Sequence, residues 1–174
     1  LSSAASDVYK RQRTIKAQYE HIPMVILTPF SHGITKRIAN EDLSSFDYIF
    51  CWLGNTDLLV SIIKLIEDKM NLEHDVSEVG VQIILLVEDG IRFYSSILPN
   101  LYKFVLKQSQ EFSTEALNAH QRTLRMRGRP KIVLARTYNE AIGIYEKYKN
   151  NILGVITDVR FPRVERGEKD ALAG

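Results

Sequence analysis

The sequence has few of the residues on which several common protein classes depend. Its single cysteine, Cys51, excludes an internal disulfide and suits a reducing compartment. The four histidines lack the spacing of a zinc site, no glycine-rich phosphate loop is present, and no apolar run is long enough to span a bilayer. We therefore expect a cytoplasmic protein without a membrane partner.

Net charge also excludes a strong electrostatic preference for one class of partner. The formal charge is +2 over 174 residues, a length that suits one domain or parts of two. One basic motif, Arg127-Gly128-Arg129-Pro130, resembles a minor-groove hook. It lies between a predicted helix and a predicted strand, however, and a hook needs an extended, free segment. We therefore predict a basic helix end and no nucleic-acid partner.

The beginning of the chain differs from the rest. Residues 1–12 resemble a translated sequencing adapter, with Asp-Val-Tyr-Lys-Arg-Gln as the characteristic run. We expect this adapter-like scar to take no part in the fold. The native N-terminus is then expected to be missing, and the chain is expected to be a fragment at both ends.

Two apolar runs end in acidic residues. Ile83-Ile84-Leu85-Leu86-Val87 precedes Glu88 and Asp89, and residues 152–157 precede Asp158. Continuous apolar runs are typical of parallel strands buried on both faces, and such sheets bind ligands at their carboxyl edge. Because parallel strands end at the same edge, the three carboxylates are predicted to converge. Their mutual repulsion favours a hard divalent cation such as Mg²⁺.

The remaining pattern alternates strands with helices. It predicts strand–helix–strand–helix over residues 13–70 and strand–helix–strand–helix–strand over residues 81–174. The predicted strands are 24–28, 47–53, 82–87, 131–135 and 152–157, and the predicted helices are 34–45, 57–70, 91–112, 113–127 and 138–149. Residues 71–80 are polar and acidic, and we predict a linker there. Such alternation indicates an α/β fold with a parallel sheet and right-handed crossovers.

The second half resembles the receiver domain of response regulators. Receivers begin with an apolar strand and an acidic pair, and their phosphorylated aspartate ends the third strand, commonly as Asp-x-x-Met-Pro. Here the motif is Asp158-Val159-Arg160-Phe161-Pro162. The resemblance implies that Asp158 is the phosphoacceptor and that Glu88 and Asp89 are its metal pair. It also implies that the backbone carbonyl of Arg160 completes the Mg²⁺ shell.

The first half resembles the other end of the same family. Residues 24–28 resemble the fourth receiver strand, with Thr28 as its switch hydroxyl. Residues 47–53 resemble the fifth strand, but Cys51 and Trp52 occupy the places of the family's lysine and proline. Residues 13–70 then form the C-terminal half of a degenerate pseudo-receiver, and residues 81–174 the N-terminal part of a second, incomplete receiver-like domain.

The fold implied by the resemblance is flavodoxin-like, a doubly wound parallel sheet with strand order 2-1-3-4-5. The two halves together supply one complete set of strands in permuted order. One hypothesis is therefore a single five-stranded sheet in which Thr28 approaches Asp158. The alternative is a pair of half-domains.

Two functions follow from these resemblances. The first is Mg²⁺-dependent phosphorylation of Asp158 in a phosphorelay, with a histidine kinase or phosphotransfer protein as donor.

The segment also resembles the region ahead of the catalytic part in large bacterial phosphoenolpyruvate synthase/pyruvate phosphate dikinase-like proteins with a PEP/pyruvate-binding domain. That likeness implies a non-phosphorylated pseudo-receiver, a regulatory or interaction region whose partners are other domains of the same longer chain. Residues 13–174 show no second nucleophile–base set, so we do not expect a separate enzyme.

Overall fold

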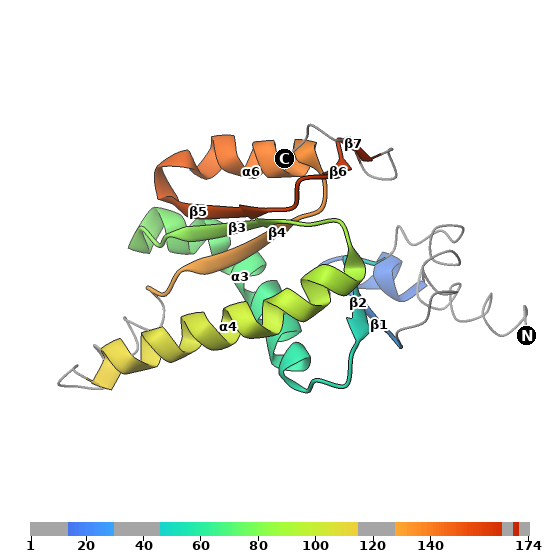
Figure 1. Ribbon diagram of the computed structural model, residues 1–174, viewed down its shortest axis with the longest axis horizontal. Helices are drawn as coiled ribbons and strands as arrows, with labels where there is room; N and C mark the ends of the chain where they lie inside the picture. Colours follow the sequence, from blue (N-terminus) through green and yellow to red (C-terminus); the bar gives the residue numbers. More distant parts are fainter. Residues whose placement is uncertain (1–13, 30–45, 115–127, 165–168, 171–174) are drawn as a thin grey trace, which may run out of the picture. The chain divides into compact units, whose positions relative to one another are not determined.

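A computed structural model describes residues 14–29, 46–114, 128–164 and 169–170 of the chain. These residues belong to two compact units, Leu1–Gly54 and Asn55–Gly174. Each unit contains parallel strands, and in the second unit helices cover the sheet (Figure 1). The α/β class predicted from the alternating pattern is therefore confirmed.

The first unit contains a two-stranded parallel sheet. Strand β1 (Val25–Pro29) pairs with strand β2 (Tyr48–Trp52). Asp47 joins the beginnings of the two strands, because its Oδ2 accepts hydrogen bonds from the Met24 backbone N–H and the Lys16 ammonium, both at 2.8 Å. Both strands were predicted from their apolar runs, whereas the helix predicted at 34–45 lies outside the described residues.

The second unit contains a three-stranded parallel sheet. Its elements are α3 (Asp57–Val79), β3 (Ile83–Val87), α4 (Ile91–Thr114), β4 (Lys131–Ala135), α6 (Tyr138–Tyr148), the 3-10 helix η1 (Lys149–Asn151) and β5 (Ile152–Thr157), followed by a short antiparallel pair, β6 (Phe161–Pro162) and β7 (Lys169–Asp170). The spatial order is β4-β3-β5. When the three strands are numbered along the chain as 1 (β3), 2 (β4) and 3 (β5), their spatial order is 2-1-3. The flavodoxin-like order 2-1-3-4-5 begins with the same three positions.

Helices cover both faces of this sheet. Strand residues alternate between the faces, and on one face Leu85 and Val87 pack with Ala141 of α6. Helix α4 lies on the other side (Figure 1), where its residues Leu98 and Tyr102 are almost fully buried. Strands β3 and β4 are buried along most of their length, as their apolar runs predicted. The same expectation is wrong for β5, an edge strand in which Leu153, Val155 and Ile156 are exposed.

The described strands do not form the single five-stranded sheet that we hypothesised. They fall into separate sheets of two and three strands. A single sheet would need β1 beside β5. In the structure β1 pairs with β2, and β5 pairs with β3. The alternative of two half-domains stays a prediction.

The predicted linker at residues 71–80 is wrong, because helix α3 continues to Val79. One face of this segment is buried: Leu72 and Val76 pack near Ile83 and Val133. The helix ends at Gly80, whose φ of 68° is left-handed and therefore favours glycine. The division between the compact units accordingly falls after Gly54 rather than at residues 71–80.

A buried ionic cluster attaches α3 to the edge of the sheet. The Asp68 carboxylate, with 0% exposure, accepts hydrogen bonds from Arg129 at 2.6 and 3.0 Å and from the Tyr102 hydroxyl at 3.0 Å. It also accepts the Ile132 backbone N–H at 3.1 Å. That N–H lies on the outer edge of β4, so Asp68 satisfies a backbone group that the sheet leaves without a partner strand.

Candidate acidic metal site

Three carboxylates meet at the carboxyl edge of the three-stranded sheet. Glu88 and Asp89 follow β3, Asp158 follows β5, and one carboxylate oxygen from each lies within 4.8 Å of the others. Backbone hydrogen bonds hold both strand ends, since the Glu88 N–H donates to Ala135 and the Asp158 N–H donates to Val87. The structure thus brings together the three side chains that the sequence predicted to converge.

The three acids differ in depth. Glu88 is 7% exposed, Asp89 is half-buried and Asp158 is exposed. Glu88 Oε1 accepts the Gly90 backbone N–H at 2.7 Å, and Asp158 Oδ1 accepts the Val159 N–H at 2.7 Å. The group therefore combines a buried, hydrogen-bonded acid, Glu88, with a solvent-exposed acid, Asp158.

Electrostatics favours a cation among these groups. Two carboxylate charges about 4 Å apart repel by up to roughly 4 kcal/mol at an effective dielectric near 20. A divalent cation removes that repulsion, and carboxylate oxygens are the donors that hard cations prefer. The three acids fit such an ion by number and chemistry. Mg²⁺, Mn²⁺ and Ca²⁺ all accept this donor set.

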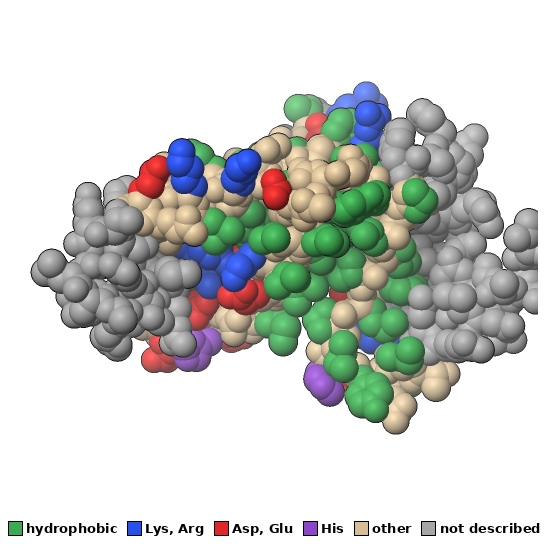
Figure 2. All heavy atoms as spheres, turned by 90° about the horizontal axis from the view of Figure 1, so that it is seen from below, with side chains coloured by type: hydrophobic (Ala, Val, Ile, Leu, Met, Phe, Trp, Pro, Cys, Tyr) green, Lys and Arg blue, Asp and Glu red, His purple; other side chains and the backbone are tan. Residues whose placement is uncertain are grey.

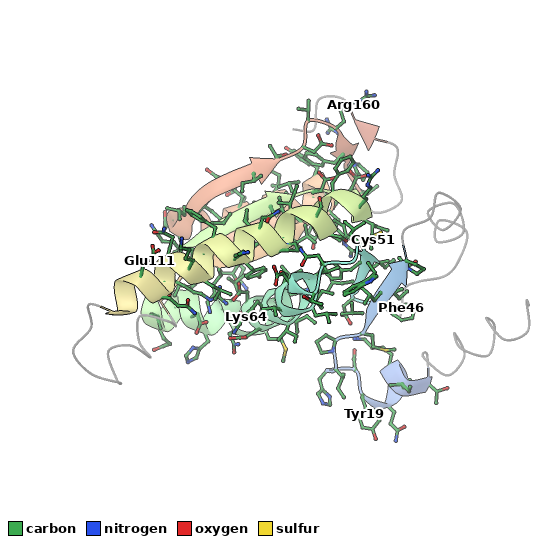
Figure 3. All side chains as sticks on the ribbon, turned by 60° about the horizontal axis from the view of Figure 1, so that its bottom comes forward. Tyr19, Phe46, Cys51, Lys64, Glu111 and Arg160 are labelled. Carbon is green, nitrogen blue, oxygen red and sulfur yellow. The ribbon has the colours of Figure 1, made fainter. Side chains whose placement is uncertain are left out.

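The loop after β5 is anchored by Phe161. Its side chain is 2% exposed and packs in the cluster that contains Leu85 and Ala135. Arg160, which is labelled in Figure 3, is an exposed residue of the same loop. Its position two residues after Asp158 is the one expected for a carbonyl ligand, and its contribution to the metal shell stays a prediction.

Thr28 belongs to the other unit. It lies in β1 opposite Cys51 of β2, and its Oγ1 donates to the Pro29 carbonyl at 3.3 Å. Cys51 is 5% exposed, in agreement with the expectation of core packing. The register neighbour of Thr28 is therefore Cys51, and the role of Thr28 as a switch hydroxyl stays a prediction.

Arg129 of the basic motif is a core residue, whereas Arg127 lies outside the described residues. Arg129 is 6% exposed and forms an ion pair with Asp68. Its guanidinium carbon lies 5.9 Å from the centroid of the Tyr102 ring. Burial opposes the charge of Arg129, but the hydrogen bonds and charge of Asp68 raise its pKa above the ordinary value. An arginine held in this way is not available to a nucleic-acid groove.

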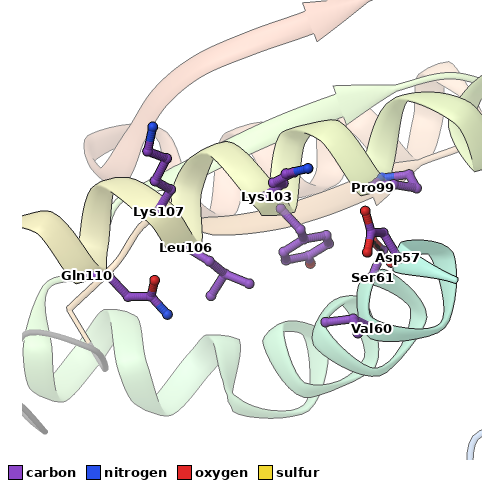
Figure 4. A pocket seen from close by; sticks show the side chains of 9 residues that line it. Asp57, Val60, Ser61, Pro99, Lys103, Leu106, Lys107 and Gln110 are labelled. Atoms are coloured by element: carbon purple, nitrogen blue, oxygen red, sulfur yellow. Dashed lines mark hydrogen bonds between the residues drawn. The ribbon is translucent and has the colours of Figure 1, made fainter.

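A groove of about 380 Å³ lies between α3 and α4 (Figure 4). Val60, Pro99 and Leu106 are among its lining residues, with Lys103 and Lys107 on the α4 side. On the face of the molecule that the space-filling view shows, hydrophobic side chains lie among charged ones (Figure 2). None of the predicted site residues lines this groove, so it is separate from the acidic group.

Comparison with known proteins does not assign the chain. No family model, curated protein or solved structure matches it. None of the described helices combines the length and the apolar character that a membrane span requires.

Two features of this unit were not predicted from the sequence. The buried position of Asp68 had a signal, because it shares a helical stripe with Leu65 and Leu72, and an acid on an apolar stripe indicates a buried partner. The close approach of Gly90 to the Glu88 carboxylate had no such signal. A Cβ at position 90 would lie 2.8 Å from Glu88 Oε1.

Proposed function

We propose that the second unit is a receiver-type phosphoacceptor module of a phosphorelay, in which Asp158 accepts a phosphoryl group in an Mg²⁺-dependent reaction. One observation carries the proposal: the carboxylates of Glu88, Asp89 and Asp158 lie within 4.8 Å at the carboxyl edge of a parallel sheet. The β4-β3-β5 strand order is compatible with it. The proposed donor is a histidine kinase or phosphotransfer protein in the cytoplasm.

The different depths of the acids suggest different roles. Asp158 is exposed, so its carboxylate oxygen can reach the phosphorus of a donor. In the transfer a new bond forms between Asp158 and phosphorus, the phosphorus–nitrogen bond of the donor breaks, and the histidine keeps the electron pair. Glu88 is buried and hydrogen-bonded to Gly90, which suits a fixed ligand.

Glu88, Asp89 and Asp158, with the Arg160 carbonyl, would hold the cation. A bound Mg²⁺ would neutralise charge on the transferring phosphoryl group. The protein's part is to hold the carboxylates in position. The backbone hydrogen bonds at the ends of β3 and β5 supply that orientation.

The test exposes the 174-residue chain to Mg²⁺ with acetyl phosphate or beryllofluoride. We expect the mass of one phosphoryl group to be added with acetyl phosphate, and NMR shifts near Asp158 with beryllofluoride. Both responses should disappear in Asp158→Asn. The matched control is Asp57→Asn, which removes an exposed acid at the start of α3, outside the acidic group. Equal modification of the wild type and Asp158→Asn would refute the proposal.

The alternative function is a non-phosphorylated pseudo-receiver, a regulatory or interaction region of a larger phosphoenolpyruvate synthase/pyruvate phosphate dikinase-like protein. The observation that favours it concerns the first unit, where buried Cys51 lies opposite Thr28 in the family's lysine place. A neutral thiol cannot contact a phosphoryl group as a lysine does. Absence of any Mg²⁺ or beryllofluoride response near Asp158 would support this alternative.

A further inference from the structure

Gly90 leaves no space for a side chain. A Cβ at this position would lie 2.8 Å from Glu88 Oε1 and 2.8 Å from Phe93 Cδ2, closer than Cβ atoms approach such atoms in proteins. The backbone itself does not demand glycine, because the positive φ angles among the described glycines belong to Gly54 and Gly80. The requirement at position 90 is therefore steric and comes from its neighbours.

Of the two neighbours, Glu88 is the constrained one. Its side chain is buried at 7% exposure, and its Oε1 accepts the Gly90 N–H at 2.7 Å. Phe93 is 61% exposed, so its ring can rotate into solvent. A methyl group at position 90 would therefore be accommodated by displacing the Glu88 carboxylate from the acidic group.

The length of the glutamate explains the conflict. An aspartate commonly accepts the N–H two residues later in an Asx-turn, and this arrangement does not depend on glycine. Glutamate has one more methylene, so its carboxylate must fold back over position 90 to reach the same N–H. Here that fold-back places Oε1 in the volume of a Cβ.

We infer that Gly90 is a positioning residue for Glu88, and that glutamate at 88 and glycine at 90 are a matched pair. Gly90 holds the carboxylate through its N–H and makes room for it by lacking a Cβ. The consequence for cation binding rests on the proposed function, whereas the steric coupling of the two positions does not. Gly90→Ala should be harmful with glutamate at 88 and tolerated with aspartate.

The first measurement is a double-mutant cycle in metal-free protein. Urea midpoints are compared for the wild type, Gly90→Ala, Glu88→Asp and the double variant. We expect Gly90→Ala to lower the midpoint in the wild-type background and to have a clearly smaller effect in the Glu88→Asp background. Gly143→Ala is the steric control, because no atom would meet its Cβ within 4 Å, so this variant should not lower the midpoint. Equal effects of Gly90→Ala in both backgrounds would overturn the inference.

The second measurement is calorimetric titration of the same variants with Mg²⁺ or Mn²⁺. Displacing a ligand through its supporting contact typically weakens metal binding by about 10–100-fold, so we expect Gly90→Ala to bind about tenfold more weakly. Gly143→Ala should bind like the wild type. Unchanged affinity in Gly90→Ala would contradict the positioning role. If the wild type binds neither ion, the proposed function fails, while the urea cycle still decides whether positions 88 and 90 are coupled.

Discussion

The strongest stability prediction concerns Asp68→Asn. The Asp68 carboxylate is fully buried and accepts hydrogen bonds from Arg129, Tyr102 and Ile132. The substitution preserves the shape of the side chain but removes its charge. Arg129, at 6% exposure, then keeps a buried positive charge without its ionic partner.

The magnitude follows from that uncompensated charge. Breaking one partner of a buried ion pair typically costs about 3–5 kcal/mol. Lys131 lies 3.7 Å from Asp68 but also pairs with Asp75 at 2.7 Å, so it retains a partner. We therefore expect Asp68→Asn to lower the free energy of unfolding by about 3 kcal/mol, the lower end of that range.

Urea unfolding followed by circular dichroism measures this loss, because helices α3 and α4 dominate the signal of the second unit. The matched control is Glu67→Gln, which removes the charge of the neighbouring residue. Glu67 pairs with Lys64 at 2.6 Å, and both side chains are at least 30% exposed, so its loss should cost less than about 1 kcal/mol. Equal destabilisation by the two variants would refute the buried-charge reasoning.

Three further predictions follow from other residues of the second unit. Burial raises the pKa of Asp75, but the hydrogen bond and charge of Lys131 outweigh it and hold that pKa below the ordinary 3.8. The stabilisation from Asp75 is therefore present above about pH 4 and lost as pH falls through the lowered pKa; urea unfolding of Asp75→Asn should show a weaker acid dependence. Thr137 accepts a backbone N–H at the start of α6, whereas Thr56 has no side-chain cap bond. Thermal unfolding should show a loss of about 1 kcal/mol for Thr137→Ala and little change for Thr56→Ala. Mg²⁺ should raise the melting temperature of the wild type but not of Asp158→Asn, and equal shifts would contradict a site that includes Asp158.

The strands and the acidic edge were predictable because they depend on local pattern. An unbroken apolar run such as Ile83–Val87 has few stable environments other than a sheet buried on both faces. Parallel geometry then places the residue after each strand at the same edge. The convergence of Glu88, Asp89 and Asp158 required no more than these two facts.

The extent of α3 was not predictable in the same way. Residues 71–79 are mostly polar, and only Leu72, Asp75 and Val76 have partners that explain a buried face. Asp75 becomes a buried residue because Lys131 lies on the adjacent strand. The sequence contains both residues but does not show that they form an ion pair. Without a visible partner, an acid in a polar segment is expected to be exposed to solvent.

By itself, the sequence determined where strands form and which strand ends carry acids, because an unbroken apolar run followed by a polar residue is a pattern of neighbouring residues. The tertiary structure decided which unit α3 belongs to, that Asp68 and Arg129 are core residues, and that Gly90 makes room for Glu88. These outcomes depend on contacts between residues far apart in the chain or on side-chain positions within about 3 Å. The helical stripe of Leu65, Asp68 and Leu72 indicates a buried face of α3, but the partner of Asp68 and the space at Gly90 are established only by packing in three dimensions.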